Sequence, residues 1–432
     1  MKVFLLVWFG QLVSAIGSRL TGFAMGVWMY QQTGSVTQYA LIYLFTYLPE
    51  TLMSPIAGAL VDRWDRRTAM IVSDAGAAVC TLAIAFLLFN NYLHPWNLYP
   101  ILAIKAGFTA FQIPAYIAAT SLLVSKEHYS RTGGMIQLAQ AASQVAAPML
   151  AGFLVGVIQV QGVFVIDFCT FLVANLTLLA VKFPQPEVSV AGKSSKGSLW
   201  QEMVAGWHYI TQRPGMLGLL IFLLMPFFTL GMLEALFTPL ILSFATVAQL
   251  GTVLTVGGCG WLLGSVCITS WGGPKKRIYG VFGFVIMQGC CLFLSGLQHS
   301  VTLAAIGCFG YLFAYPIILS CNQAIWQSKV LPDLQGRVFG VRRLIEQLPP
   351  GIAYIIAGPL VDRCFEPWLS ANGLLANSVG KILGVGSGRG ISFLFIIIGS
   401  LNILATILTY QYPQIRLIEK QLPDAIGGKP IN

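Results

Sequence analysis

Seven ionisable side chains inside long apolar runs are the strongest candidates for chemistry in this sequence. They are Arg19, Glu50, Asp74, Lys105, Asp167, Glu234 and Glu346. A charge in apolar surroundings is costly unless it meets water or a partner. A carboxyl group there can also take up or release a proton when its surroundings change. These residues therefore indicate ion pairs, ligand contacts or proton carriers, and not covalent catalysis.

Four of the seven lie well inside their apolar runs and are the stronger candidates. Arg19 and Glu50 lie near the middles of the first two apolar runs, so we expect them to form an ion pair. Lys105 either lines a cavity or extends its ammonium to the outer surface. Glu234 has no basic residue within two helical turns, which favours it as a proton carrier.

Asp74, Asp167 and Glu346 are weaker candidates, because each lies within a few residues of an end of its apolar run. Arg342 precedes Glu346 by one helical turn. We therefore expect local pairing between these two side chains.

The composition of the chain indicates that membrane-spanning helices hold these residues. The chain is 56% hydrophobic and only 9% charged, against about 25% charged in soluble domains. Apolar runs of roughly 20 residues, enough to cross a bilayer as helix, recur along it. The predicted spans are 3–30, 38–61, 69–90, 98–124, 132–158, 163–182, 215–242, 249–271, 278–297, 301–327, 338–361 and 389–412. The sequence thus predicts an all-α membrane protein with about twelve transmembrane helices.

The spans fall into two groups of six, separated by the polar stretch from Lys182 to Ser198. The expected parts are an N-terminal six-helix half, a cytoplasmic linker, a C-terminal six-helix half and a cytoplasmic tail, at 1–183, 184–214, 215–412 and 413–432. In the linker, Ser198 and Gln201 suggest a capping box for an amphipathic helix along the inner membrane surface.

The basic residues set the orientation, since cytoplasmic loops retain Lys and Arg. Alternate connections hold 20 of the 25 basic residues, whereas the other face holds only Arg363, Lys381 and Arg389. Both termini are therefore expected in the cytoplasm, with the chain in the inner or plasma membrane. The net charge of +10 is then mostly a topology signal, and no basic face is free for nucleic acid.

Two stretches three hundred positions apart are near copies. "IAGALVDRWDRR" begins at Ile56 and closes the second span on the cytoplasmic side, whereas "IAGPLVDRCFEP" begins at Ile356 and closes the eleventh span on the outside. Their Gly58 and Gly358 are expected to let another helix approach closely.

A third relative, "AAPMLAGFLVG", lies in the fifth span and contains Pro148 and Gly152; a fainter fourth lies in the eighth span. Spans two, five, eight and eleven are the equivalents in two halves with 3+3 inverted repeats.

These residues carry a family resemblance. Gly58 to Arg67 resembles the loop 2–3 signature of the major facilitator superfamily, and the resemblance covers essentially the whole chain. Gly107 to Arg131 and Pro332 to Pro349 resemble its macrolide-efflux and siderophore-exporter branch. The resemblance implies a secondary transporter that exposes a central cavity to each side in turn, with Lys105 and Glu234 on cavity-lining helices. Asp65 departs from the signature, which usually has a glycine there.

The loop after the second span is the expected cytoplasmic gate, with Arg63 among its charges. Asp62 can accept hydrogen bonds from the first turn of a neighbouring helix, where the dipole favours an anion. Arg66 and Arg67 can bridge to acids across the cytoplasmic face, and Glu127 is a candidate. The alternative is that these residues only anchor a span at the lipid headgroups.

Other chemistry is not indicated. The cysteines have no CxxC spacing and the histidines are scattered, so no metal site or cofactor is expected. "GKSS" at Gly192 lacks the glycine and strand of a phosphate-binding loop. The glycine run Gly384 to Gly390 is expected to be a structural turn. The chain is therefore not expected to be an enzyme, and no ATPase subunit is implied.

The favoured function is proton-driven export, by antiport, of a small amphipathic organic molecule such as a drug, macrolide or siderophore. An importer on the same fold and a non-transporting receptor or assembly partner are the alternatives. Polar and aromatic residues on the cavity helices suit a large ligand of mixed polarity. They are Gln11, Trp28, Phe108, Phe111, Gln112, Phe227 and Asn322.

The topology gives a first prediction. A cysteine introduced beside Arg66 should react with a membrane-impermeant thiol reagent only from the cytoplasm, and one beside Arg363 only from outside. Labelling is measured in intact cells and inverted vesicles, with the nine natural cysteines replaced. Reaction of both positions from the same side would contradict the predicted orientation.

Overall fold

The computed structural model describes residues 2–61, 64–124, 129–181, 199–331 and 334–422, and within them it contains helices and no strand. The chain divides into two compact units. The first comprises Met1–Ser189 with Ala245–Thr255, and the second comprises Val190–Phe244 with Val256–Asn432.

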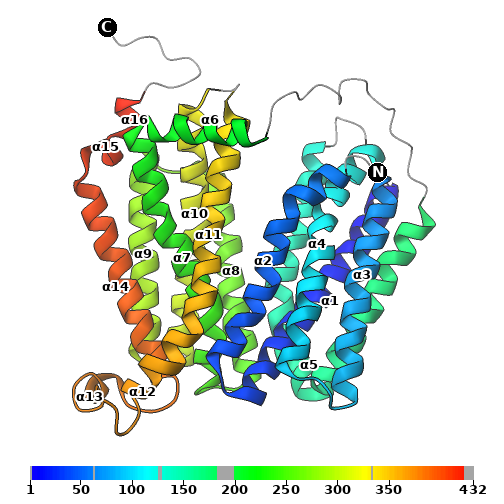
Figure 1. Cartoon of the computed structure of the whole chain (residues 1–432), viewed down its shortest axis with the longest axis horizontal. Coiled ribbons are helices and arrows are strands. Elements are labelled where there is room, and N and C mark those ends of the chain that lie inside the picture. Colours follow the sequence, from blue (N-terminus) through cyan, green and yellow to red (C-terminus); the bar gives the residue numbers. More distant parts are fainter. Residues whose placement is uncertain (1, 62–63, 125–128, 182–198, 332–333, 423–432) are drawn as a thin grey trace. The chain divides into compact units, whose positions relative to one another are not determined.

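The first unit is built from five long helices, which are coloured from blue to green in Figure 1. They are α1 (Lys2–Thr33), α2 (Val36–Val61), α3 (Arg66–Phe89), α4 (Pro95–Leu123) and α5 (Tyr129–Ala180). Within α5 the backbone breaks at Gln159, where φ is 60° and ψ is 178°. α5 therefore contains two of the predicted spans, which divide at this residue.

The second unit contains α6 (Leu199–Thr211) and further long helices, with the start of α8 grouped with the first unit. The long helices are α7 (Pro214–Leu242), α8 (Val247–Trp271), α9 (Arg277–Leu297), α10 (Val301–Lys329), α11 (Gln335–Leu360) and α14 (Arg389–Gln411). Among the described residues, ten helices are long and apolar enough to cross a membrane. With α2, and with α5 counted twice, the predicted twelve-helix fold is confirmed.

Packing in the first unit places α1 along α5, and α4 against both α2 and α3. Small residues shape a further contact in this unit, between α5 and the start of α8. A Cβ on Gly152 would lie 3.0 Å from the Val247 carbonyl oxygen, and one on Gly251 would lie 2.5 Å from the Pro148 carbonyl oxygen. By contrast, no atom lies within 4 Å of a Cβ on Gly58. Among the described residues of the first unit, no helix approaches Gly58 closely, and its packing role remains a prediction.

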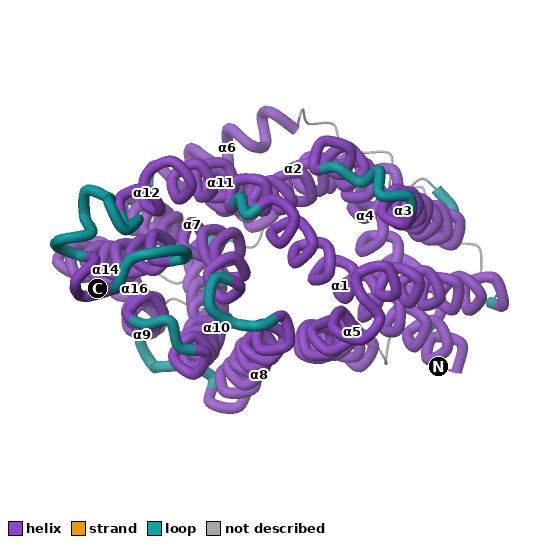
Figure 2. Tube along the Cα trace, turned by 90° about the horizontal axis from the view of Figure 1, so that it is seen from below, coloured by secondary structure: helices purple, strands orange, loops and turns teal. Residues whose placement is uncertain are grey.

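In the second unit α9 packs between α10 and α14, as the end-on view in Figure 2 shows. α7 packs against α11, where a Cβ on Gly231 would lie 2.8 Å from Cα of Pro350. Gly358 is also buried in α11. Prolines inside these helices are tolerated because neighbouring groups satisfy the backbone they free.

The helix α6 crosses the ends of α10 and α11 (Figure 1). Tyr209 donates its hydroxyl hydrogen to the Lys329 carbonyl, 3.2 Å away. Ile210 is buried, whereas Met203 and Trp207 are exposed. The exposed apolar side chains suit a helix at a membrane surface, although Ser198 and the Gln201 side chain of the expected capping box lie outside the described residues.

The second copy of the repeated stretch continues α11 into a π-helical turn, η3 (Val361–Phe365). Two short helices, α12 (Glu366–Trp368) and α13 (Gly380–Leu383), then lead to α14. Positive φ angles of 87°, 117° and 80° at Gly384, Gly386 and Gly388 fit glycine alone without strain. The glycine run is a structural turn, as predicted.

The C-terminal segment docks on the second unit through α15 (Pro413–Arg416) and α16 (Ile418–Gln421). The Lys329 ammonium donates to the carbonyl oxygens of Glu419, at 3.0 Å, and Leu422, at 2.5 Å. The Glu419 carboxylate in turn accepts the Ile278 backbone N–H, 3.1 Å away, in the first turn of α9. These contacts attach the tail to the ends of α9 and α10.

His299 lies in the connection between α9 and α10. Its ring stacks on Phe244 with centroids 4.6 Å apart, and its Nε2 is 3.2 Å from the Ser392 hydroxyl. Burial and the nearby Arg389 cation lower the pKa of His299 to about 4. The imidazole is therefore neutral in the folded protein at neutral pH.

This histidine predicts a pH-dependent stability. Between about pH 6.5 and about pH 4 the unfolded imidazole binds a proton and the folded one does not, so stability should fall as the pH falls through this window. His299→Asn should remove that part of the slope, measured as the melting temperature of detergent-purified protein. His94→Asn, at an exposed histidine, is the matched control. An unchanged slope in His299→Asn would contradict the assignment.

Candidate functional site

A buried carboxylate lies at the junction of α1, α3 and α4. Asp74 is only 5% exposed. Gln112 donates to its Oδ1 at 2.8 Å and Gln11 donates to its Oδ2 at 3.1 Å. Gln112 also donates to Oε1 of Gln11, at 3.2 Å. Asp74 lies eight residues after the first residue of α3, which begins three residues before the predicted span.

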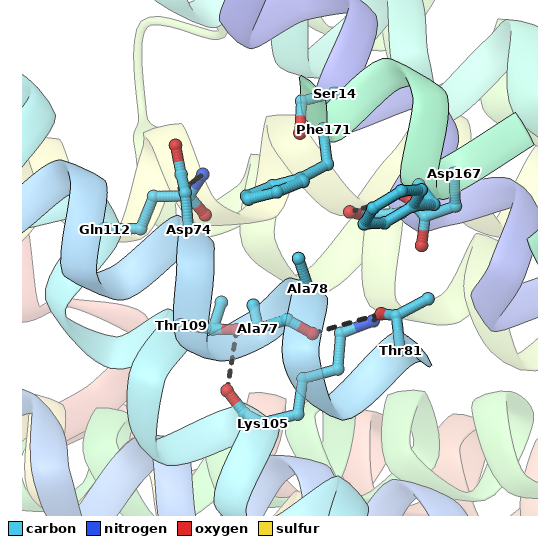
Figure 3. Close-up of a pocket in the computed structure, with 12 residues that line it drawn as sticks. Ser14, Asp74, Ala77, Ala78, Thr81, Lys105, Thr109, Gln112, Asp167 and Phe171 are labelled. Atoms are coloured by element: carbon cyan, nitrogen blue, oxygen red, sulfur yellow. Dashed lines mark hydrogen bonds between the residues drawn. The ribbon is translucent and has the colours of Figure 1, made fainter. Parts of the chain in front are cut away.

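Beside this cluster is a cavity of about 100 Å³ inside the first unit (Figure 3). Its lining is Ser14, Ser18, Asp74, Ala77, Ala78, Thr81, Lys105, Thr109, Gln112, Asp167, Phe168 and Phe171. The Lys105 ammonium donates to the Thr81 hydroxyl at 2.9 Å. Asp167 accepts a hydrogen bond from Ser18 at 3.4 Å. Lys105 therefore lines a cavity, one of the two alternatives for this residue.

Arg19 does not pair with Glu50. Its guanidinium donates to the Ser143 hydroxyl at 3.0 Å and to Oε1 of Gln140 at 3.5 Å. The described residues show no Arg19–Glu50 salt bridge, and Glu50 is half-buried on α2. The predicted ion pair is wrong because α1 packs along α5, which gives Arg19 its polar partners there.

Glu234 lies on α7 in the second unit. It is exposed, whereas its neighbours on the helix from Gly231 to Ile241 are buried. Tyr354 on α11 donates its hydroxyl hydrogen to the Glu234 carboxylate. The helix thus presents one exposed acidic residue, hydrogen-bonded to a hydroxyl group, among apolar residues. The sequence marked Glu234 but not Tyr354, which is 120 residues away.

A second polar cluster in the same unit joins α10 and α11. Arg342 and Glu346 form a salt bridge of 2.7 Å, so the predicted local pairing is confirmed. Asn322 donates to the same Glu346 oxygen at 3.3 Å, and Arg342 donates to Oε1 of Gln323 at 3.0 Å. The Glu346 charge is therefore compensated within its own unit.

The expected gate is only partly described. Asp62, Arg63 and Glu127 lie outside the described residues, as does the side chain of Arg66, where α3 begins. Their predicted contacts therefore remain predictions.

Asp65 caps the N-terminus of α3. Its carboxylate accepts the Arg67 backbone N–H at 3.2 Å and the Thr68 hydroxyl hydrogen at 3.0 Å. Asp is among the preferred capping residues, so the departure from the family signature at this position has a local reason. An aspartate four residues before the predicted span 69–90 was the signal that could have revealed an earlier helix start.

Arg67 binds within its own unit. Its guanidinium donates to the carbonyl oxygens of Leu178, at 3.0 Å, and Leu179, at 2.8 Å. These are among the last carbonyls of α5, where the helix dipole favours a cation. In this structure Arg67 therefore stabilises a helix end, and the predicted bridge from Arg67 to an acid is absent from the described part of the chain.

Comparison with known proteins decides the family. Residues 7–354 match the sequence profile of the Major Facilitator Superfamily. The chain belongs to this superfamily. It is accordingly a multi-pass membrane transporter and not an enzyme.

Named relatives cover most of the chain. Macrolide efflux protein A of Streptococcus pyogenes is 28% identical over 377 residues, which is 86% of this chain and 93% of that protein. The multidrug efflux pump Tap of Mycolicibacterium fortuitum is 24% identical over 369 residues, covering 83% and 89% of the two chains. The crystal structure of the nucleoside transporter NupG matches with a TM-score of 0.74 at 12% identity, over 95% of this chain and all of the other. The structural likeness concerns the fold alone.

The cap on α3 predicts a stability effect. Asp65→Ala should lower the free energy of unfolding by roughly 0.5–2 kcal/mol, because it removes the acceptor for the first-turn N–H. Asp65→Asn should retain most of the stability, since Asn caps about as well. Both are measured by denaturant unfolding of the detergent-purified protein. Wild-type stability in Asp65→Ala would exclude the capping role.

Proposed function

We propose that this transporter is a proton-driven exporter of a small amphipathic organic compound, working by alternating access and proton antiport. The observation that carries the proposal is the exposed acidic residue Glu234 on an otherwise buried, apolar stretch of α7. A carboxylate in an apolar span is costly unless water or a polar partner stabilises it, and such residues often mark ion or proton pathways.

Glu234 suits the binding and release of a proton. Its partner in the described part of the chain is the neutral Tyr354 hydroxyl, and no cation forms a salt bridge with it there. A carboxyl whose hydration differs between two conformations binds a proton in one and releases it in the other. The Tyr354 hydroxyl can donate to the carboxylate and accept from the acid, so it fits both forms.

The relatives support the direction of transport and the substrate class. Two of them are named for efflux, one of macrolides and one of multiple drugs. We propose export of compounds of this kind, with Arg19, Lys105 and Glu50 as further cavity residues. A proton moving inward down its gradient would supply the free energy, about 2.3 kcal/mol per charge for each 100 mV.

The proposal includes the place of the transporter in the cell. We infer that it lies in the plasma membrane with both termini in the cytoplasm, from the distribution of Lys and Arg. The two six-helix halves would move against each other, with the loop around Asp62 to Arg67 as part of the cytoplasmic gate. Pro148, Gly152 and Gly358 would serve as packing positions.

Substitution of Glu234 tests the coupling. Glu234→Gln should abolish proton-driven accumulation of radiolabelled erythromycin, a macrolide, in inverted vesicles, because the amide cannot carry a proton. Downhill counterflow of erythromycin should persist. The matched control is Glu366→Gln, at a half-buried carboxyl on the short helix α12, and it should retain gradient-driven transport. Full accumulation by Glu234→Gln would contradict the proposed coupling role, and accumulation only in right-side-out vesicles would indicate an importer.

A further inference from the structure

The first unit buries a carboxylate without a neighbouring cation. Asp74 is 5% exposed and its two hydrogen-bond donors, Gln11 and Gln112, are neutral amides. No salt bridge to Asp74 occurs among the described residues. An ionised carboxylate in a dry interior is costly without a paired cation. The neutral acid form removes that cost.

The charged groups facing Asp74 do not compensate it directly. On α4, Lys105 binds Thr81, which is seven residues further along α3 and so about 10 Å away at helical rise. On α5, Asp167 adds a second negative charge to the same cavity. The α1 side chains of this cavity, Ser14 and Ser18, are uncharged. If all three ionisable groups were charged, the cavity would carry two carboxylates against one ammonium.

Asp74 and Asp167 are both buried, at 5% and 4% exposed, but their hydrogen-bond donors differ. The donor to Asp167 is the hydroxyl of Ser18, a residue that is exposed. Asp74 has amide donors on both oxygens, and it lines the same cavity as Ser18. The cavity therefore offers a route for a proton to Asp74.

The amides around Asp74 can report its protonation state. The anion accepts two N–H bonds, whereas the acid donates its own O–H to one acceptor. Oε1 of Gln11 is the nearby acceptor, and it now accepts from Gln112. Uptake of one proton from water by Asp74 would therefore require the Gln11 amide to turn and exchange partners. These three side chains come from α1, α3 and α4, so the exchange changes the links between three helices (Figure 3 shows the Asp74 and Gln112 pair).

We propose that Asp74 is a proton-binding site in the first unit, with Gln11 and Gln112 as the positioning residues that couple its protonation to the contacts among α1, α3 and α4. It would be a second site in addition to Glu234, and its role in transport rests on the proposed proton-driven function. Proton binding itself can be measured without transport or substrate.

The test uses infrared difference spectra of the purified full-length protein in lipid nanodiscs, titrated from acid to alkaline pH. The readout is the carbonyl stretch of a protonated carboxylic acid. In the Glu234→Gln background a titrating band should remain, and adding Asp74→Asn should remove it. Adding Asp167→Asn instead, as the matched control, should leave it in place. Asp74→Glu in the same background should shift the band, which keeps the test usable if Asp74→Asn does not fold.

The positioning role has its own readout. Gln112→Leu removes an amide donor to the Asp74 anion, so the acid band should persist to a higher pH than in the parent, a change that a purely structural role would not produce. Absence of a titrating band in Glu234→Gln would overturn the proposal, as would loss of the band only with Asp167→Asn. If the Asp74 band is retained but transport does not depend on the proton gradient, the proposed function is refuted. The proton-binding site at Asp74 is then still supported.

Discussion

The cost of placing a charge in apolar surroundings is the constraint on which the other features of this protein depend. A chain with 9% charged residues keeps only a few of them inside its spans, and the structure shows how they are tolerated. Arg342 and Glu346 pair with each other, and Lys105 binds a hydroxyl group beside a cavity. Asp74 and Glu234 accept hydrogen bonds from neutral donors. We propose that protonation of these two carboxyls removes the electrostatic cost of burying their charge.

Charged side chains also bind backbone groups at the helix ends. Asp65 caps the start of α3, and Arg67 binds the last carbonyls of α5. In the second unit Lys329 and Glu419 connect the tail to the ends of α10 and α9. In each unit a charged side chain satisfies backbone groups that a helix leaves open at its end. Loops and helix ends are therefore linked within each unit.

Much of the fold could be predicted from the sequence, because span length and apolar composition are local properties. The division of α5 at Gln159 matches the predicted break, and the local pairing of Arg342 with Glu346 follows from helical spacing. Side-chain partners between helices were harder. Arg19 and Glu50 share a depth, but depth does not determine which way a side chain points around its helix. The Tyr354 partner of Glu234 joins positions 120 residues apart, and only helix packing brings them together. The Asp65 cap could have been predicted from an aspartate shortly before the span 69–90, although the helix begins three residues earlier than predicted.

The central claim is that transport is coupled to proton movement in the opposite direction. Its most direct test is the internal pH of proteoliposomes that contain the wild-type protein and a trapped pH-sensitive dye, with no gradient imposed. On addition of external erythromycin, inward movement of the macrolide should drive protons outward, and the interior should become alkaline faster than in protein-free liposomes. Erythromycin entry with the same pH change as in protein-free liposomes, or with acidification, would contradict the account.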